Sequence, residues 1–311
     1  MHPMIYLTFD CEDFINIRST FTLHRILELL QKYNIKGLFF LTGHMVEKIR
    51  NFPKILDLLE SHEIGYHSSA HTVRPTIVEY TDVKDYGLAR QISLKRETSH
   101  INPLTGECEG KGGILLLRRF FPKNQVLSFR APGFSWSPPH LEALKKLDIE
   151  FDFSANLAPT PISYKGITFY PSPTLIDTIN PFEYRIVAKS LAQSRFAVLD
   201  FHPSYFVNMN YWDSIYFSGN PERLYPVKAR MWEETTALLR KFELLLRCFS
   251  LSQKSGVITF TPPLEKSEEK PTFTKERVMK SYLASINWTK NYFSYKPRFQ
   301  RDHFKKFFEL T

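Results

Sequence analysis

Apolar and polar positions along the first 70 residues alternate in blocks that predict strand, helix, strand, helix and strand. Three short apolar runs are typical of buried strands: MIYLTF (4–9), KGLFFL (36–41) and EIGYH (63–67). The segments 19–33 and 51–62 between them carry apolar side chains at helical spacing, and Pro53 stands near the start of the second. This alternation predicts parallel strands joined by crossover helices, with an active site at the carboxyl ends of the strands.

The α/β pattern continues beyond an irregular stretch, roughly residues 75–125, which contains the turn-rich insertion 101–113. Helices are predicted at SPPHLEALKKL (137–147), with Ser137 as its cap, and at 227–249. Four segments predict a strand followed by a loop: VLSFRAPGF (126–134), IEFDFSAN (149–156), FAVLDFHP (196–203) and GVITFTPP (256–263). The chain then turns polar, which predicts a domain over residues 1–265 and an extension over residues 266–311.

Composition indicates a packed globular core, with 43% hydrophobic and 23% charged residues. The net charge of +9 favours anionic partners, but the first 260 residues contain no compact block of Lys and Arg interleaved with aromatics. We therefore expect no nucleic-acid partner. The segment 289–311 does mix six basic residues with aromatics. It is either an ordinary extension that packs on the domain, or a tail that contacts a membrane surface or anionic polymer.

Three cysteines, Cys11, Cys108 and Cys248, are too few and too widely spaced for a disulfide framework, and they indicate a reducing compartment. The sequence has no apolar run of membrane-spanning length, and its first residues, MHPMIYLTFD, do not resemble a secretory signal. We expect a cytoplasmic protein. Peripheral attachment to the inner membrane face through the basic tail remains an alternative.

Three acids, Asp10, Glu12 and Asp13, follow the first predicted strand, and His67 and His71 follow the third. Parallel strands would bring these ends together, and H-x-x-x-H spacing would place both imidazoles on one face if that segment were helical. Two imidazoles and a carboxylate make a site for a divalent transition metal, which would offset the repulsion among clustered acids. The alternative is that the three acids only cap the helix that follows.

The order of short motifs resembles that of the polysaccharide deacetylases, carbohydrate esterase family four, over about residues 4–260. The subgroup with F-D-x-E-D and R-A-P-x-F-S, found in exopolysaccharide and cell-surface glycan gene clusters, is the most similar. The matching segments are Thr8-Phe9-Asp10 followed by Cys11-Glu12-Asp13, then His67-Ser68-Ser69-Ala70-His71, Arg130-Ala131-Pro132, Phe151-Asp152-Phe153-Ser154 and Leu199-Asp200-Phe201-His202-Pro203.

The resemblance implies a distorted parallel (β/α) barrel and a hydrolase that removes N-acetyl groups from an amino sugar or glycan. It implies a divalent ion, zinc, held by His67, His71 and either Glu12 or Asp13, since one extra residue separates the acids here from the family's usual pair. The ion would activate a water molecule for attack on the amide. Four further side chains are implied to be catalytic: Asp10 as base, His202 as acid, Arg130 as the partner of Asp10 or another site acid, and Asp152 as the carboxylate beside His202.

Two other functions stay open on the sequence alone. Enzymes related by fold open small cyclic or linear amides, some of them without a metal, so the substrate need not be a sugar. A non-catalytic glycan-binding protein is the third possibility.

Overall fold

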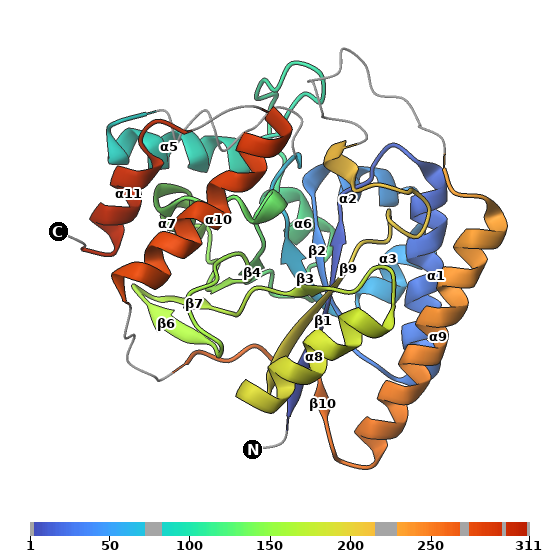
Figure 1. Ribbon diagram of the computed structural model, residues 1–311. Coiled ribbons are helices and arrows are strands. Elements are labelled where there is room, and N and C mark those ends of the chain that lie inside the picture. Colours follow the sequence, from blue (N-terminus) through green and yellow to red (C-terminus); the bar gives the residue numbers. More distant parts are fainter. Residues whose placement is uncertain (1–2, 72–82, 215–228, 268–273, 294–296, 310–311) are drawn as a thin grey trace.

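The computed structural model describes residues 3–71, 83–214, 229–267, 274–293 and 297–309. Ten strands in this part of the chain form one curled sheet, in the order β6-β7-β5-β4-β3-β2-β1-β9-β8, with β10 beside β1 (Figure 1). All neighbouring strands run parallel except β6 and β7, which are antiparallel. The strands are β1 (Met4–Cys11), β2 (Leu38–Leu41), β3 (Glu63–Tyr66), β4 (Ser128–Phe129), β5 (Phe151–Asp152), β6 (Ile162–Tyr164), β7 (Ile167–Phe169), β8 (Thr174–Leu175), β9 (Phe196–Phe201) and β10 (Thr259–Phe260).

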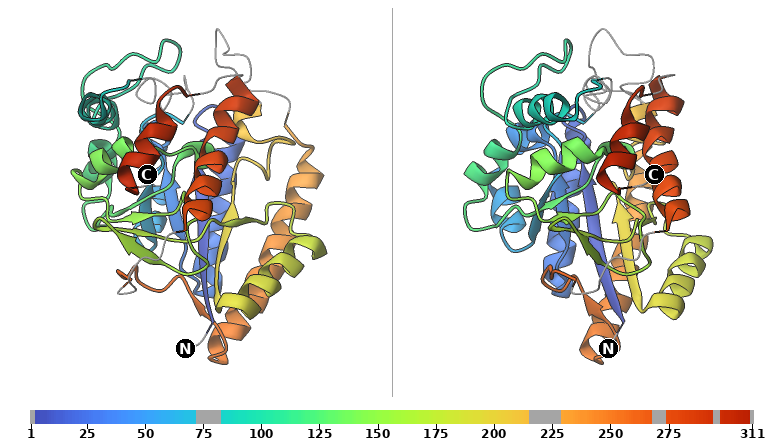
Figure 2. Two further views of the ribbon diagram at one scale, coloured as in Figure 1. Left: turned by 60° about the vertical axis from the view of Figure 1, so that its left-hand side comes forward. Right: turned by 90° about the vertical axis from the view of Figure 1, so that its left-hand side faces the viewer.

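Helices surround this half-barrel, with α1 and α9 side by side along one flank and α5, α7 and α11 grouped at the other (Figures 1 and 2). The helices are α1 (Ile17–Tyr33), α2 (Gly43–Ile49), α3 (Pro53–Leu59), α5 (Tyr86–Glu97), α6 (Ile114–Phe120), η1 (Pro132–Phe134), α7 (Pro138–Lys145), α8 (Pro181–Ser194), α9 (Trp232–Lys254), α10 (Lys275–Phe293) and α11 (Gln300–Phe307). The predicted α/β class with a distorted parallel barrel is confirmed.

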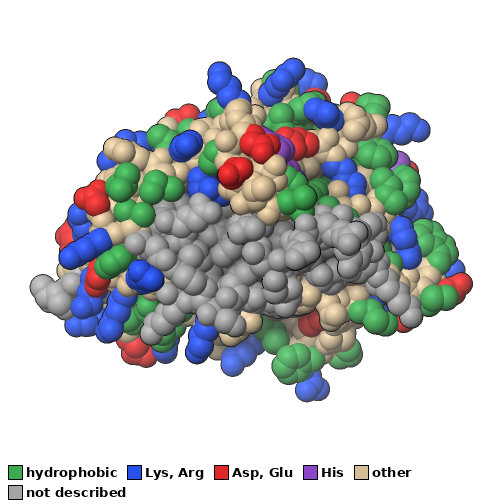
Figure 3. Space-filling view, turned by 90° about the horizontal axis from the view of Figure 1, so that it is seen from above, with side chains coloured by type: hydrophobic (Ala, Val, Ile, Leu, Met, Phe, Trp, Pro, Cys, Tyr) green, Lys and Arg blue, Asp and Glu red, His purple; other side chains and the backbone are tan. Residues whose placement is uncertain are grey.

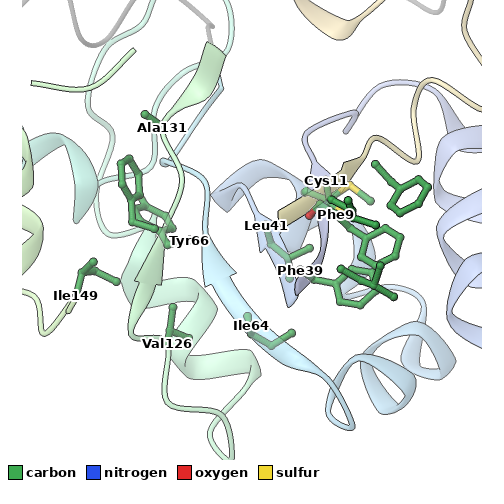
Figure 4. Close-up of a cluster of buried hydrophobic side chains, with 14 of the residues drawn as sticks. Phe9, Cys11, Phe39, Leu41, Ile64, Tyr66, Val126, Ala131 and Ile149 are labelled. Atoms are coloured by element: carbon green, nitrogen blue, oxygen red, sulfur yellow. Dashed lines mark hydrogen bonds between the residues drawn. The ribbon is translucent and has the colours of Figure 1, made fainter. Parts of the chain in front are cut away.

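The central strand β1 is buried on both faces, and its alternation separates two environments. Phe9 and Cys11 point into the apolar layer beneath the helices, where the Phe9 ring stacks on Phe39 with centroids 4.5 Å apart (Figure 4). Successive side chains point to opposite faces of a strand, so Thr8 and Asp10 point to the interior of the barrel. The same alternation that builds the core therefore directs Asp10 towards the mouth of the barrel.

The extension forms two helices that pack on the barrel. Val278, Tyr282 and Ile286 of α10 and Phe304 and Phe307 of α11 are buried in the same apolar core as the strands. Many apolar side chains of the extension are therefore already packed against the domain. Contact of this segment with a membrane stays a prediction. The domain boundary at residue 265 stays a prediction as well. No helix in the described ranges has the length and apolar character needed to cross a bilayer.

Candidate active site

Asp10 lies at the end of β1 and is held by a buried arginine. Arg130, which follows β4, is fully buried and donates through Nη1 to Asp10 Oδ1 at 2.7 Å and to Asp200 Oδ1 at 2.5 Å. Its Nη2 donates to Thr8 Oγ1 at 2.8 Å, and its guanidinium lies over the Phe40 ring, 4.4 Å from the centroid. Arg130 thus fixes one oxygen of Asp10 and leaves Oδ2 towards the histidines.

Three imidazoles approach this site, each with its Nδ1 occupied by a neighbour. His67 Nδ1 lies 2.7 Å from the carbonyl of Arg130, His71 Nδ1 lies 3.2 Å from Asp213 Oδ1, and His202 Nδ1 lies 3.0 Å from Asp177 Oδ2. Such contacts set the orientation of each ring, so that Nε2 is the nitrogen that could bind a metal ion or transfer a proton.

The Nε2 atoms of two of these rings face the free oxygen of Asp10. His67 Nε2 lies 3.7 Å from Asp10 Oδ2, and His202 Nε2 lies 3.9 Å from the same atom. The rings of His67 and His71 lie 4.8 Å apart between centroids. The carboxylate and the histidines therefore converge on one small volume.

His67 and His71 meet through a turn rather than along a helix. The segment after β3 is irregular, and Ser68 has a left-handed φ of 68°. Glu97 at the end of α5 supports this turn: its carboxylate accepts from the Ser69 amide at 3.2 Å and pairs with His140 Nε2 at 2.9 Å. The H-x-x-x-H spacing would place both histidines on one helical face if their segment were a helix. The segment is not a helix, so that condition is not met.

Glu12 and Asp13 lie in different surroundings. Asp13 accepts from the Ile15 and Asn16 amides and from Ser19 Oγ, at 3.1, 2.9 and 2.5 Å, so its oxygens shape the turn into α1. Glu12 is buried, with Oε1 accepting from Ser204 Oγ at 3.1 Å and Oε2 lacking a hydrogen-bond partner among the described residues. Of the two candidate ligands, Glu12 is the one with an unused oxygen inside the site.

Asp152 makes its hydrogen bonds within its own loop and not with His202. Its two oxygens accept from the Ser154 amide, the Ser154 hydroxyl and the Ala155 amide, at 3.0, 2.8 and 2.9 Å, which caps its own loop. The carboxylate on His202 is instead Asp177, which also accepts from the His202 amide at 2.6 Å. Asp177, Asp200 and Asp213 are site residues to which sequence reasoning assigned no role.

Of these side chains, Asp10, Glu12, His71, His202 and Asp213 line a cleft of about 250 Å³ at the carboxyl ends of the strands. Aromatic and apolar walls alternate with the polar groups, and the lining includes Phe134, Leu175, Tyr211 and Trp212. Figure 3 looks down on this end of the molecule, where acidic and histidine side chains come together and Lys and Arg are scattered around the edge.

Burial shifts the pKa values of two of the three candidate ligands. Burial raises the pKa of Glu12 to about 8, because its charged form has lost water. Burial and the neighbouring His71 lower the pKa of His67 well below its usual range, which favours the neutral imidazole that ligates metals. The unpaired Glu12 oxygen and the neutral His67 imidazole are each groups that could ligate a cation such as zinc.

A second donor set overlaps the first. Ligand atoms of Asp10, Asp200 and His202 lie within 4.8 Å of one another, whereas Glu12, His67 and His71 do not form such a group in the described part of the chain. Asp10 and Asp200 already accept hydrogen bonds from the Arg130 guanidinium, and its positive charge would repel a metal ion placed beside it. The assignment of Glu12, His67 and His71 as the ligands therefore stays a prediction.

The family model described as polysaccharide deacetylase matches residues 2–151, just under half of the chain. That match supports the polysaccharide deacetylase family. The curled, mostly parallel sheet is likewise the half-barrel of this family's fold. The matched part includes β1 to β4, and so Asp10, Glu12, the two histidines of the turn and Arg130, whereas Asp177 and His202 lie beyond it. Assignment to the F-D-x-E-D subgroup stays a prediction.

Solved structures that resemble this chain include two deacetylases and one pseudoenzyme. A putative polysaccharide deacetylase from Mycobacterium smegmatis is 14% identical (TM-score 0.45; 87% of this chain and 94% of that chain covered). The catalytic domain of a peptidoglycan N-acetylglucosamine deacetylase from Eubacterium rectale is 13% identical (TM-score 0.41; 88% and 93%). A CE4 family pseudoenzyme from Bacillus anthracis is 16% identical (TM-score 0.41; 84% and 64%), so this chain spans less than two thirds of its length. No curated protein matches this sequence.

Proposed function

We propose that this protein is a metal-dependent hydrolase that removes N-acetyl groups from an amino sugar or glycan. The observation that carries the proposal is the geometry around Asp10: one oxygen is held by Arg130, and the other faces the Nε2 atoms of His67 and His202. Asp10, Glu12, His71 and His202 thus line one cleft, and His67 lies next to Asp10.

In this proposal Glu12, His67 and His71 hold a divalent ion. When bound, the ion polarises the amide carbonyl and increases the acidity of a water molecule. His71 is oriented by Asp213, and His67 by the Arg130 carbonyl, so both ligands are fixed before the ion arrives. The side chain of Asp13 serves the turn into α1 instead.

Asp10 would take the proton of the attacking water on Oδ2. Arg130 keeps Oδ1 engaged at 2.7 Å, which fixes the carboxylate plane. The pairing also prevents the carboxylate from rotating its free oxygen away from the histidines. Asp10 is therefore oriented as a general base.

His202 would protonate the leaving amine from Nε2. Burial opposes a charge on this ring, but the Asp177 carboxylate 3.0 Å away outweighs it, and the pKa of His202 is raised well above its usual range. The ring therefore holds a proton at neutral pH and can donate it. The side chain is 14% exposed, so it can reach a substrate in the cleft.

Acetate release from N-acetylated hexosamine oligosaccharides tests the function. We expect turnover by the zinc-loaded protein, loss of it when a chelator removes the metal, and recovery when zinc is added back. Full activity in chelator would contradict the proposal and favour a metal-free hydrolase of small amides. Binding of the sugar with no acetate released under any metal condition would favour a glycan-binding protein.

Replacing Asp177 by Asn should lower the turnover number by about 10²-fold and move the alkaline limb of the pH–rate profile to lower pH. The sign follows from the role of the carboxylate: Asp177 raises the pKa of His202, so its removal lets the ring lose its proton at a lower pH. Rates measured across the pH range, with the free energy of unfolding as a second readout, check this.

Asp152→Asn is the matched control, because Asp152 is an equally buried carboxylate with contacts only to its own loop among those described above. It should leave the alkaline limb in place. If Asp152→Asn moved the limb and Asp177→Asn did not, the carboxylate predicted from the sequence would be the correct one.

The location of the reaction is also a proposal. Cytoplasmic residence, with contact to the inner membrane face through the extension as the alternative, would make the substrate a precursor glycan. Fractionation of cells that produce the tagged protein would place it.

A further inference from the structure

Three side chains outside the cleft form a second cluster of metal-ligating groups. His44 and Glu47 lie three residues apart on α2 and so share one face of that helix, and His100 comes from the segment after α5. Ligand atoms of the three lie within 4.8 Å of one another. Glu47 Oε2 lies 3.3 Å from His44 Nδ1, and Glu47 Oε1 lies 2.8 Å from His100 Nδ1.

The cluster is deep on one side and open on the other. His44 is only 6% exposed, and its Nε2 lacks a hydrogen-bond partner within the described part of the chain. The side chains of Glu47 and His100 are 31% and 28% exposed, so an ion can enter from solvent. Glu47 is paired with two imidazoles, and no pairing with Lys or Arg occurs for it among the described residues.

We propose that His44, Glu47 and His100 bind a second divalent transition-metal ion, zinc, separate from the ion of the cleft. Two imidazoles and one carboxylate are a common zinc donor set that leaves a fourth position for water. With metal–ligand bonds of about 2.0–2.1 Å, tetrahedral zinc holds its donors roughly 3.3 Å apart. The two nitrogen–oxygen separations, 3.3 and 2.8 Å, are close to that spacing, and each runs to a different oxygen of Glu47. The three ligand atoms lie within 4.8 Å of one another, so binding requires side-chain movements that bring them closer together.

The second ion would link helix α2 to the segment after α5, and both of these contact the turn that carries His67 and His71. The amides of Gly43 and His44 donate to the carbonyls of Ser68 and Ser69, at 3.1 and 3.2 Å. The Ser69 hydroxyl donates to the carbonyl of Ser99, next to His100, at 2.6 Å. An ion shared by His44 and His100 would therefore tie together the backbone on both sides of this turn and stabilise it.

Zinc counting on the purified protein tests the proposal. The protein is stripped with chelator, dialysed against zinc and assayed for bound metal, as wild type, Glu47→Gln and His100→Gln. We expect each variant to hold one zinc ion fewer than the wild type, and cobalt(II) to lose one set of visible bands in each. His24→Gln is the matched control, since His24 pairs with Glu28 at 3.8 Å on α1, and it should bind zinc as the wild type does.

Equal zinc counts in the wild type, Glu47→Gln and His100→Gln would overturn the proposal. The partial exposure of Glu47 and His100 favours folding of both variants, which near-UV circular dichroism verifies, and either variant alone decides the outcome. His71→Gln separates this ion from that of the cleft. If His71→Gln keeps the wild-type count while Glu47→Gln loses an ion, the second site stands and the ligand set of the proposed function fails.

Discussion

Asp10→Asn abolishes deacetylation while the bound zinc stays, if the proposed roles are correct. The amide cannot accept the proton of the attacking water as a carboxylate does, and loss of a positioned base lowers turnover by about 10²–10⁴-fold. The variant should still fold, because Arg130 keeps its second buried partner, Asp200, at 2.5 Å. Acetate release, zinc content and thermal unfolding are measured on the same preparation.

Zinc content in this variant also separates the two donor sets. An unchanged count is expected when Glu12, His67 and His71 are the ligands, whereas loss of one ion would identify Asp10, Asp200 and His202 instead. Asp148→Asn is the control for a lost carboxylate: its side chain is 82% exposed, and its left-handed φ of 59° also suits Asn. Unchanged turnover in Asp10→Asn would remove Asp10 as the base.

The hydrophobic pattern predicted those elements whose buried face is apolar. The first three strands and the helices α1 and α3 lie where that pattern places them. Helix α5 was not predicted, because its buried side chains include Ser93, Arg96 and Glu97 and so form no apolar stripe in the sequence. In the extension, Val278, Tyr282 and Ile286 recur every four residues, a signal that could have indicated α10.

For the site, short motifs were informative where residues leave adjacent parallel strands. Asp10, His67, Arg130 and His202 each follow or end a strand, so topology alone brings them together. Asp177 was not predicted as a site residue, because it lies in a loop, where neither spacing nor periodicity indicates a partner for His202. Asp152 ends the short strand β5, as the site residues end or follow their strands, and only the contacts of its oxygens distinguish it from a catalytic acid.

Arg130→Met should destabilise the fold by about 3–5 kcal/mol, the largest stability effect expected from one substitution here. Methionine has a similar length and can pack over Phe40, so the loss arises mainly from charge. The substitution leaves Asp10 and Asp200 buried without their cation, and Thr8 without a donor. Urea unfolding followed by tryptophan fluorescence measures the change. Arg90→Met is the control, because its pair with Glu142 at 3.5 Å is partly exposed and contributes about 0–1 kcal/mol.

The deficit of Arg130→Met should depend on pH in a direction that identifies its cause. Burial already raises the pKa of Asp200, with Arg130 opposing that rise, so removal of the arginine raises the pKa further. A carboxyl group whose pKa is higher in the folded than in the unfolded state stabilises the fold below its unfolded pKa and loses that contribution as pH rises through the folded value. The variant should therefore be closest to the wild type near about pH 5 and furthest from it near about pH 8. A deficit independent of pH would indicate lost packing instead of unpaired buried carboxylates.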